Sequence, residues 1–138
     1  MKFFYWNIRG IANNNSRETL LNFVRKESPD IVCISEPMIN PDSLPSNFLK
    51  SLKMNLFCFN ARDGISKIWI LSSMDCLKLS VISNSEQEIT IDFYDNSTYK
   101  VTFVYASVYY QRRRILWDKL RSLHSQTPWV VLGDFMLS

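Results

Sequence analysis

The spacing of apolar residues along this chain changes once, and the change predicts two kinds of layer. The first part reads as strand, helix and strand, over residues 3–8, 15–27 and 31–34. Asn15, with Glu18 three residues later, is typical of a capping box at the helix start. The continuous apolar run at 31–34 indicates a strand that is covered on both faces. This order predicts a right-handed crossover that joins two parallel strands.

From residue 56 onwards the chain is a series of short strand candidates, and in the last three of them the apolar positions recur every second residue, which is typical of half-buried strands. The pattern predicts a short helix at 48–52 and then five strands, at 56–59, 68–71, 77–82, 89–94 and 100–105. Polar turn residues separate the strands, so we expect an antiparallel meander. A helix at 111–123 and a final strand from Trp129 follow, and Gly133-Asp134 reads as a turn that ends this strand.

Composition narrows the class of protein without naming a function. The 138 residues are 46% hydrophobic and 21% charged, which predicts one ordinary globular domain. The formal charge of +3 permits a polyanionic partner but does not argue for one. Cys33, Cys58 and Cys76 form no C-x-x-C pair, so we expect free thiols in a reducing compartment. No signal segment or membrane span is recognisable, so we expect an intracellular protein, nuclear or cytoplasmic, not secreted and with no membrane partner.

Three polar residues stand at the ends of the most apolar strands: Asn7, Glu36 and Asp134. Charged groups rarely lie beside such runs unless they are paired or bind a metal. Two carboxylates and an amide oxygen are hard ligands, which suit Mg²⁺ or Mn²⁺ and metal-assisted phosphate chemistry. Each residue also has a structural interpretation, because Asn7 could satisfy a turn, Glu36 could cap a loop and Asp134 could lie on the surface.

A run of three arginines, Arg112, Arg113 and Arg114, opens the second long helix. One interpretation is contact with nucleic-acid phosphates. The other is a solvated helix start. Trp69 and Trp117 fall on apolar stripes, so we expect both in the core.

Three short motifs, in this order, resemble the endonuclease/exonuclease/phosphatase superfamily: Trp6-Asn7-Ile8-Arg9-Gly10, Ser35-Glu36 and Val131-Leu132-Gly133-Asp134-Phe135. The segments around Phe103–Ser107, Leu116-Trp117 and Pro128-Trp129 narrow the resemblance to the endonuclease domain of plant LINE-type non-LTR retrotransposons. The resemblance implies a DNase I-like, four-layered α/β/β/α sandwich and Mg²⁺-dependent phosphodiester cleavage. It implies that Glu36 is the metal ligand, that Asn7 supports it, that Tyr105 approaches the phosphate and that Asp134 orients water.

The chain departs from this family in two ways. Met136 stands where an asparagine is usual, and a thioether cannot replace an amide. The family's C-terminal aspartate and aspartate-histidine pair have no counterpart, and His124, expected near a helix end, is no substitute. We therefore expect residues 1–138 to be a partial, N-terminal portion of the domain that is truncated and catalytically inactive.

Two alternatives to this inactive domain stay open. One is an active Mg²⁺-dependent DNA endonuclease, and the other is a non-enzymatic remnant that binds nucleic acid. The chemistry of the chain permits DNA as a partner. The sequence predicts no specific protein partner. A nucleotide-binding α/β module is disfavoured, because the glycines are scattered and form no phosphate loop.

Overall fold

The structure, a computed structural model, describes residues 2–60, 64–74 and 78–135. Within these ranges the chain forms two compact units, residues 1–76 and 77–138, each with its own four-stranded sheet. The first unit contains β1 (Phe3–Asn7), α1 (Asn14–Glu27), β2 (Ile31–Ser35), a 3₁₀ turn η1 (Pro41–Ser43), α2 (Phe48–Leu52), β3 (Met54–Phe59) and β4 (Ile68–Ser73). The second contains β5 (Lys78–Asn84), β6 (Glu88–Asp95), β7 (Ser97–Tyr105), α3 (Tyr110–Ser122) and β8 (Trp129–Asp134).

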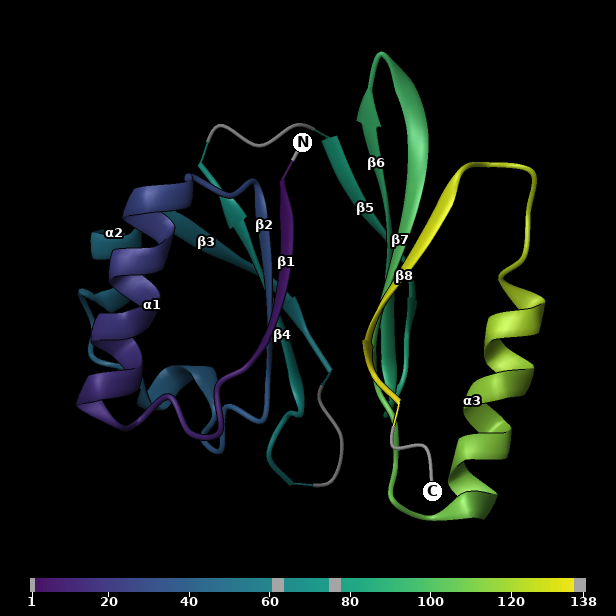
Figure 1. The fold of residues 1–138 in the computed structure, drawn as a ribbon, viewed down its shortest axis with the longest axis horizontal. Coiled ribbons are helices and arrows are strands. Elements are labelled where there is room, and N and C mark those ends of the chain that lie inside the picture. Colours follow the sequence, from purple (N-terminus) through teal and green to yellow (C-terminus); the bar gives the residue numbers. More distant parts are fainter. Residues whose placement is uncertain (1, 61–63, 75–77, 136–138) are drawn as a thin grey trace. The chain divides into compact units, whose positions relative to one another are not determined.

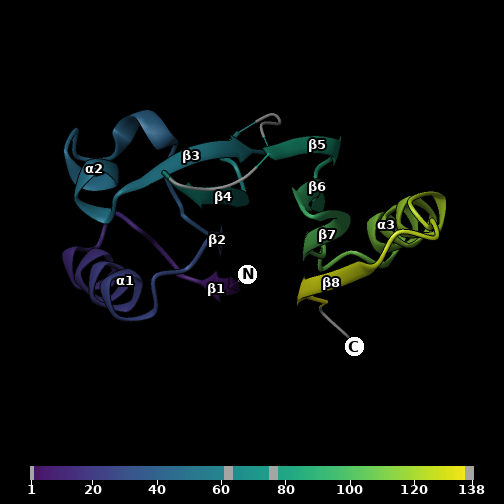
Figure 2. The same cartoon turned by 90° about the horizontal axis from the view of Figure 1, so that it is seen from above.

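The sheet of the first unit has the strand order β1-β2-β4-β3, with β1 and β2 parallel and the other pairs antiparallel. The predicted strand, helix and strand are confirmed, and α1 makes the crossover between the parallel pair. Figures 1 and 2 show α1 and α2 on the same side of this sheet. Among the described residues of this unit, no helix lies on the opposite face of the sheet.

Helix α1 begins two residues earlier than its sequence signal indicated. Asn13, not Asn15, is the N-cap, and its side chain accepts a hydrogen bond from the backbone N–H of Asn15. The expected capping box is therefore wrong, because the run of asparagines offers several caps and packing selects one of them. The helix ends at Ser28, which takes the left-handed conformation, and Pro29 follows it.

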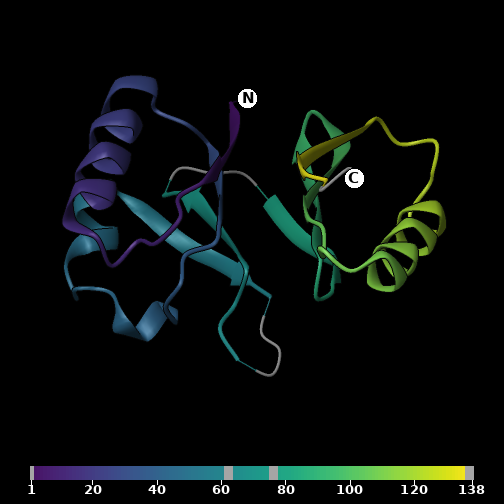
Figure 3. The same cartoon turned by 60° about the horizontal axis from the view of Figure 1, so that its bottom comes forward.

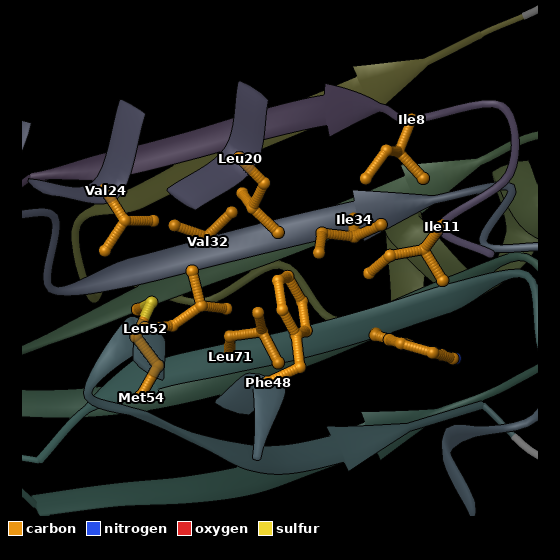
Figure 4. Packing of buried hydrophobic residues seen from close by; sticks show 11 residues of the cluster. Ile8, Ile11, Leu20, Val24, Val32, Ile34, Phe48, Leu52, Met54 and Leu71 are labelled. Carbon is orange, nitrogen blue, oxygen red and sulfur yellow. The ribbon is translucent and has the colours of Figure 1, made fainter. Parts of the chain in front are cut away.

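The core of the first unit forms where α1 and α2 cover the sheet. Leu20 of α1, Val32 and Ile34 of β2 and Phe48 of α2 belong to one buried cluster, whose packing Figure 4 shows. Trp69 lies in the same cluster, as expected. All five residues of β2 are buried, so the strand is covered on both faces as its apolar run predicted. Burying each large aliphatic side chain contributes about 1.5–3 kcal/mol.

The second unit has the strand order β5-β6-β7-β8, which Figure 2 shows, and α3 lies beside this sheet (Figure 3). Strands β5, β6 and β7 form the expected antiparallel meander, and α3 leads back to β8, which pairs parallel with β7. The meander contains three of the five predicted strands. Strands β3 and β4 belong to the first sheet instead, where β4 lies between β2 and β3 and is paired along both edges.

Gly133 lies inside β8 and not in a turn, which corrects the expectation from sequence. It pairs with Val104 of β7, and a Cβ atom at this position would lie 2.2 Å from the Val104 carbonyl oxygen. The glycine is therefore required by the close approach of two strands. Asp134 is the last residue of β8 and is half-buried.

Two of the three cysteines have thiols whose pKa is raised by burial. Cys33 and Cys58 are free, and both pair in register with Ile70 of β4. Burial raises the pKa of Cys58 to about 12 and, with a smaller effect of Cys58, raises the pKa of Cys33 well above its usual value. Both thiols are protonated at neutral pH; Cys76 lies outside the described residues.

None of the helices in the described ranges is long and apolar enough to span a membrane.

Candidate metal and phosphate site

Asn7 and Glu36 come together where the two parallel strands end. Asn7 is the last residue of β1 and pairs in register with Ser35, the last residue of β2. Glu36 follows at once, with a φ of +51° that is uncommon for a residue other than glycine. The Asn7 Nδ2 donates a hydrogen bond to Glu36 Oε2. The structure therefore brings together two of the predicted site residues, 29 positions apart in the chain.

Two oxygen atoms beside this pair have no hydrogen-bond partner among the described residues. They are Asn7 Oδ1 and Ser35 Oγ, and both are buried. Because Asn7 and Ser35 are register partners on neighbouring parallel strands, their side chains lie on the same face of the sheet. A buried oxygen without a partner is costly unless a ligand or water satisfies it. Ser35 is part of the Ser35-Glu36 motif, but the sequence by itself assigns it no role in the site.

The backbone of Glu36 is held from two sides. Its N–H donates to the Lys67 carbonyl at 3.1 Å, and its carbonyl accepts from Gly10 N–H at 2.9 Å. The segment that carries Lys67 is itself held by Asn60, whose buried Oδ1 accepts hydrogen bonds from Ser66 Oγ and from the N–H groups of Lys67 and Ile68. Asn60 is a second residue that sequence reasoning missed, because a lone asparagine after a strand reads as turn chemistry.

A hollow of about 250 Å³ opens beside the carboxylate and is lined by Glu36, Met38, Ile65, Ser66 and Lys67. A larger hollow of about 360 Å³ lies between β1 and α1, but its lining is mainly aromatic and contains no carboxylate. A third hollow, of about 490 Å³, also combines a carboxylate with cations, since Asp30, Arg25 and Lys53 line it. The hollow at Glu36 differs from both in that the carboxylate lining it is hydrogen-bonded to Asn7, another predicted site residue.

The donor set at this place fits a hard cation of the Mg²⁺ type. Within the described residues no group of three or more His, Cys, Asp or Glu side chains could hold a metal. Mg²⁺ does not need one, because it is commonly bound through one or two carboxylates and keeps waters or phosphate oxygens as its other ligands. The Glu36 carboxylate and the unpartnered Asn7 Oδ1 supply such oxygen donors.

Tyr105 and Asp134 form the second pair, in the second unit. They are register partners at the ends of β7 and β8, and Ala106 N–H donates to the Asp134 carbonyl at 2.9 Å. Val104 belongs to the cluster that packs on α3, so Tyr105 and Asp134 lie on the opposite face of their sheet. The structure describes the two pairs of site residues each within its own unit. Met136 lies outside the described residues.

The three arginines of α3 have three different environments. Arg112 is exposed and makes an ion pair of 2.9 Å with Glu86. Arg113 is buried, and its guanidinium donates to the carbonyls of Ser107 and Val108. Arg114 is exposed, and no hydrogen bond or ion pair joins it to the described part of the chain.

Predictions from the sequence also concern two further residues of this region. His124 is exposed beyond the end of α3, and Trp117 packs in the core against Phe135, as expected.

The sequence pattern of the Endonuclease/Exonuclease/phosphatase family matches residues 4–135 of this chain. No curated protein matches its sequence. Solved structures do match. An AP endonuclease from Archaeoglobus fulgidus aligns with a TM-score of 0.71 and 16% identity, over 98% of this chain and 57% of that one. The endonuclease domain of TRAS1, a telomere-specific non-LTR retrotransposon, aligns with a TM-score of 0.73 and 12% identity, over 97% and 59%.

A third similar structure is a humanized TDP2 from D. rerio, with a TM-score of 0.65 and 14% identity, over 97% of this chain and 65% of that one. The chain thus spans less than two thirds of the length of each of these three structures. At these identities the likeness shows the fold alone. Each unit is a sheet with helices on one face, and an α/β/β/α sandwich of the DNase I type is made of two such halves.

Proposed function

The chain belongs to the Endonuclease/Exonuclease/phosphatase family, and from this membership we propose that it is the metal-binding part of a divalent-metal-dependent phosphodiesterase that acts on nucleic acid. We propose Mg²⁺ as the metal and DNA as the substrate. We also propose an origin in a plant LINE-type retrotransposon, which the likeness to the TRAS1 domain supports without identifying the host. A nucleic-acid substrate implies a location in the nucleus or the cytoplasm.

The observation that carries the proposal is the unpartnered Asn7 Oδ1 beside Glu36. The Asn7 amide uses its N–H to orient the carboxylate and leaves its oxygen free in a buried place. A structural role for Asn7 predicts that both ends of the amide are satisfied by the protein. A role in metal binding predicts an oxygen that only the ligand satisfies.

The proposed roles of the site residues are those that the family resemblance implies. Asn7 and Glu36 would hold the ion, which when bound would supply charge stabilisation at a phosphoryl oxygen. In the complete domain Tyr105 would approach the phosphate and Asp134 would orient the attacking water. The shared face of β7 and β8 keeps these two side chains beside each other.

We further propose that these 138 residues alone do not cleave nucleic acid. The resemblance assigns a further aspartate and an aspartate-histidine pair to a part of the family domain that this chain does not include. The loss of one catalytic group costs about 10²–10⁴-fold in rate, so the joint loss leaves no measurable turnover. Metal binding needs only the Asn7 and Glu36 pair and is expected to persist.

Metal binding is tested by electron paramagnetic resonance of Mn²⁺ titrated with the protein. We expect binding by the parent chain and an affinity about 10-fold lower or worse in Glu36→Ala and Asn7→Ala. Glu18→Ala is the matched control, since Glu18 is an exposed carboxylate on α1. Equal binding by Glu36→Ala and the parent chain would show that the metal, if bound, is held elsewhere.

Turnover is tested with supercoiled plasmid and Mg²⁺. We expect no nicking above the level of Glu36→Ala. Nicking that disappears in Glu36→Ala identifies the chain as an active endonuclease instead. Plasmid binding without Mn²⁺ binding identifies a non-enzymatic remnant.

A further inference from the structure

Large apolar side chains gather in the open at the start of α3. Val108, Tyr109, Tyr110 and Ile115 are 64%, 61%, 63% and 68% exposed. Neighbouring exposed apolar groups of this size mark interaction sites more often than single ones do. We call Tyr109 and Tyr110, with the exposed Arg112 and Arg114, the tyrosine platform.

The residues at the start of α3 are not those that stabilise a helix N-terminus. Tyr109 is the N-cap of α3, and its side chain makes no capping hydrogen bond. Serine, aspartate or asparagine at this position stabilises a helix by about 1 kcal/mol relative to residues that cannot cap. The first turn also contains no acidic residue. Residues that are unfavourable for the helix in which they lie indicate a requirement other than the stability of that helix.

Hydrogen bonds hold the backbone under the platform in one conformation. Gln87 accepts from Ser107 N–H and donates to the Arg112 carbonyl, both at 2.7 Å. The Tyr109 N–H donates to Ser107 Oγ at 3.1 Å, and Arg113 donates to two loop carbonyls. The tyrosines therefore project from an ordered support, so binding does not have to order the loop.

Positive charge accompanies both rings. The Arg112 guanidinium lies 5.6 Å from the centre of the Tyr109 ring, and that of Arg113 lies 6.0 Å from the centre of the Tyr110 ring. The exposed Arg114 adds a cation without a partner in the described ranges. Aromatic rings interleaved with arginine offer stacking surfaces to bases and cations to phosphates.

We propose that the tyrosine platform binds single-stranded nucleic acid by stacking Tyr109 and Tyr110 on unpaired bases, while Arg112 and Arg114 contact the neighbouring phosphates. In a duplex the faces of the bases are already stacked on one another, so exposed rings favour bases that have left the stack. This inference rests on the proposed function for its substrate class, and it adds the strand form and the residues that bind it.

The test is fluorescence anisotropy of a labelled thymidine oligonucleotide of about 12 nucleotides, and of a labelled duplex of equal length, both in EDTA. EDTA removes any contribution of metal, so failure here leaves the Mn²⁺ test of the proposed function untouched. We expect tighter binding of the single strand and a loss of about five-fold or more for Tyr109→Ala and for Tyr110→Ala. Tyr109→Phe and Tyr110→Phe keep the ring and are expected to bind like the parent chain.

Tyr94→Ala is the matched control, because Tyr94 is a tyrosine of β6 that is 51% exposed. Circular dichroism of each variant verifies folding. Parent affinity in Tyr109→Ala and Tyr110→Ala, an equal loss in Tyr94→Ala, or no binding of the single strand would each overturn the platform.

Discussion

Two residues of this chain take positions for which their local sequence provides no reason. Glu36 has a positive φ directly after a buried strand, and this turn directs its carboxylate to Asn7. Backbone strain of this kind costs about 1–3 kcal/mol and tends to persist at functional sites. At position 133 a glycine is required because the carbonyl of Val104 leaves no room for a Cβ atom, and not because the chain turns there.

Gly133→Ala is expected to destabilise the second unit by about 1–3 kcal/mol, because the new methyl group overlaps the Val104 carbonyl and must push β8 away from β7. Urea unfolding followed by tryptophan fluorescence and circular dichroism measures the loss. Val130→Ala, at an exposed position of the same strand, is the control and is expected to change stability little. An unchanged midpoint for Gly133→Ala would show that β8 does not pair with β7 in this register.

The elements of this chain are held in place by side chains at their ends. Asn13 caps α1, and Lys100 of β7 donates from Nζ to the carbonyl of Leu123 at the end of α3. Gln87 links the start of β6 to the start of α3 in the same manner. The bonds made by Asn13 and Lys100 satisfy groups at helix ends that the helix hydrogen-bond pattern leaves without a partner, and those made by Gln87 link two elements.

The two asparagines at the start of α1 make the capping assignment testable. Asn13→Ala is expected to lower the free energy of unfolding by about 1 kcal/mol, because the Asn15 N–H loses its acceptor. Asn15→Ala is expected to be neutral or slightly stabilising, since alanine has the higher helix propensity inside the first turn. Thermal unfolding by circular dichroism compares the two variants. A larger loss for Asn15→Ala would restore the capping box that the sequence indicated.

The whole molecule carries little net charge, with 16 lysines and arginines against 13 aspartates and glutamates. Long-range attraction to a polyanion is therefore weak, and binding depends on a few local cations. Some basic side chains already have carboxylate partners: Arg121 pairs with Asp118, and Arg112 pairs with Glu86, which a phosphate has to displace before Arg112 can bind it. The number of phosphate contacts is accordingly expected to be small.

This expectation gives a salt dependence for the single-stranded oligonucleotide. Contacts by Arg112 and Arg114 predict that log K falls with log [KCl] with a slope of about −1.4, at about −0.7 per phosphate. Arg114→Ala is expected to bring the slope to about −0.7, whereas Arg121→Ala, in the last turn of α3, leaves it unchanged. Anisotropy titrations at several KCl concentrations measure each slope. A slope that Arg114→Ala does not change would remove Arg114 from the interface.

The sequence by itself determined most elements of this protein and the chemistry at the strand ends. Apolar spacing located the strands and the three α-helices, because the side-chain period of an element is a local property. The motifs around Asn7, Glu36 and Asp134 indicated the family for the same reason, since they are short and contiguous.

Only the tertiary structure decided which strands share a sheet and which side chains meet. The insertion of β4 between β2 and β3 and the approach of Gly133 to Val104 both depend on residues distant in the chain. The pairing of Asn7 with Glu36 and the unpartnered Ser35 hydroxyl arise likewise from the register of two parallel strands. The choice of strand partners and of their register follows from long-range packing, which no local pattern of residues encodes.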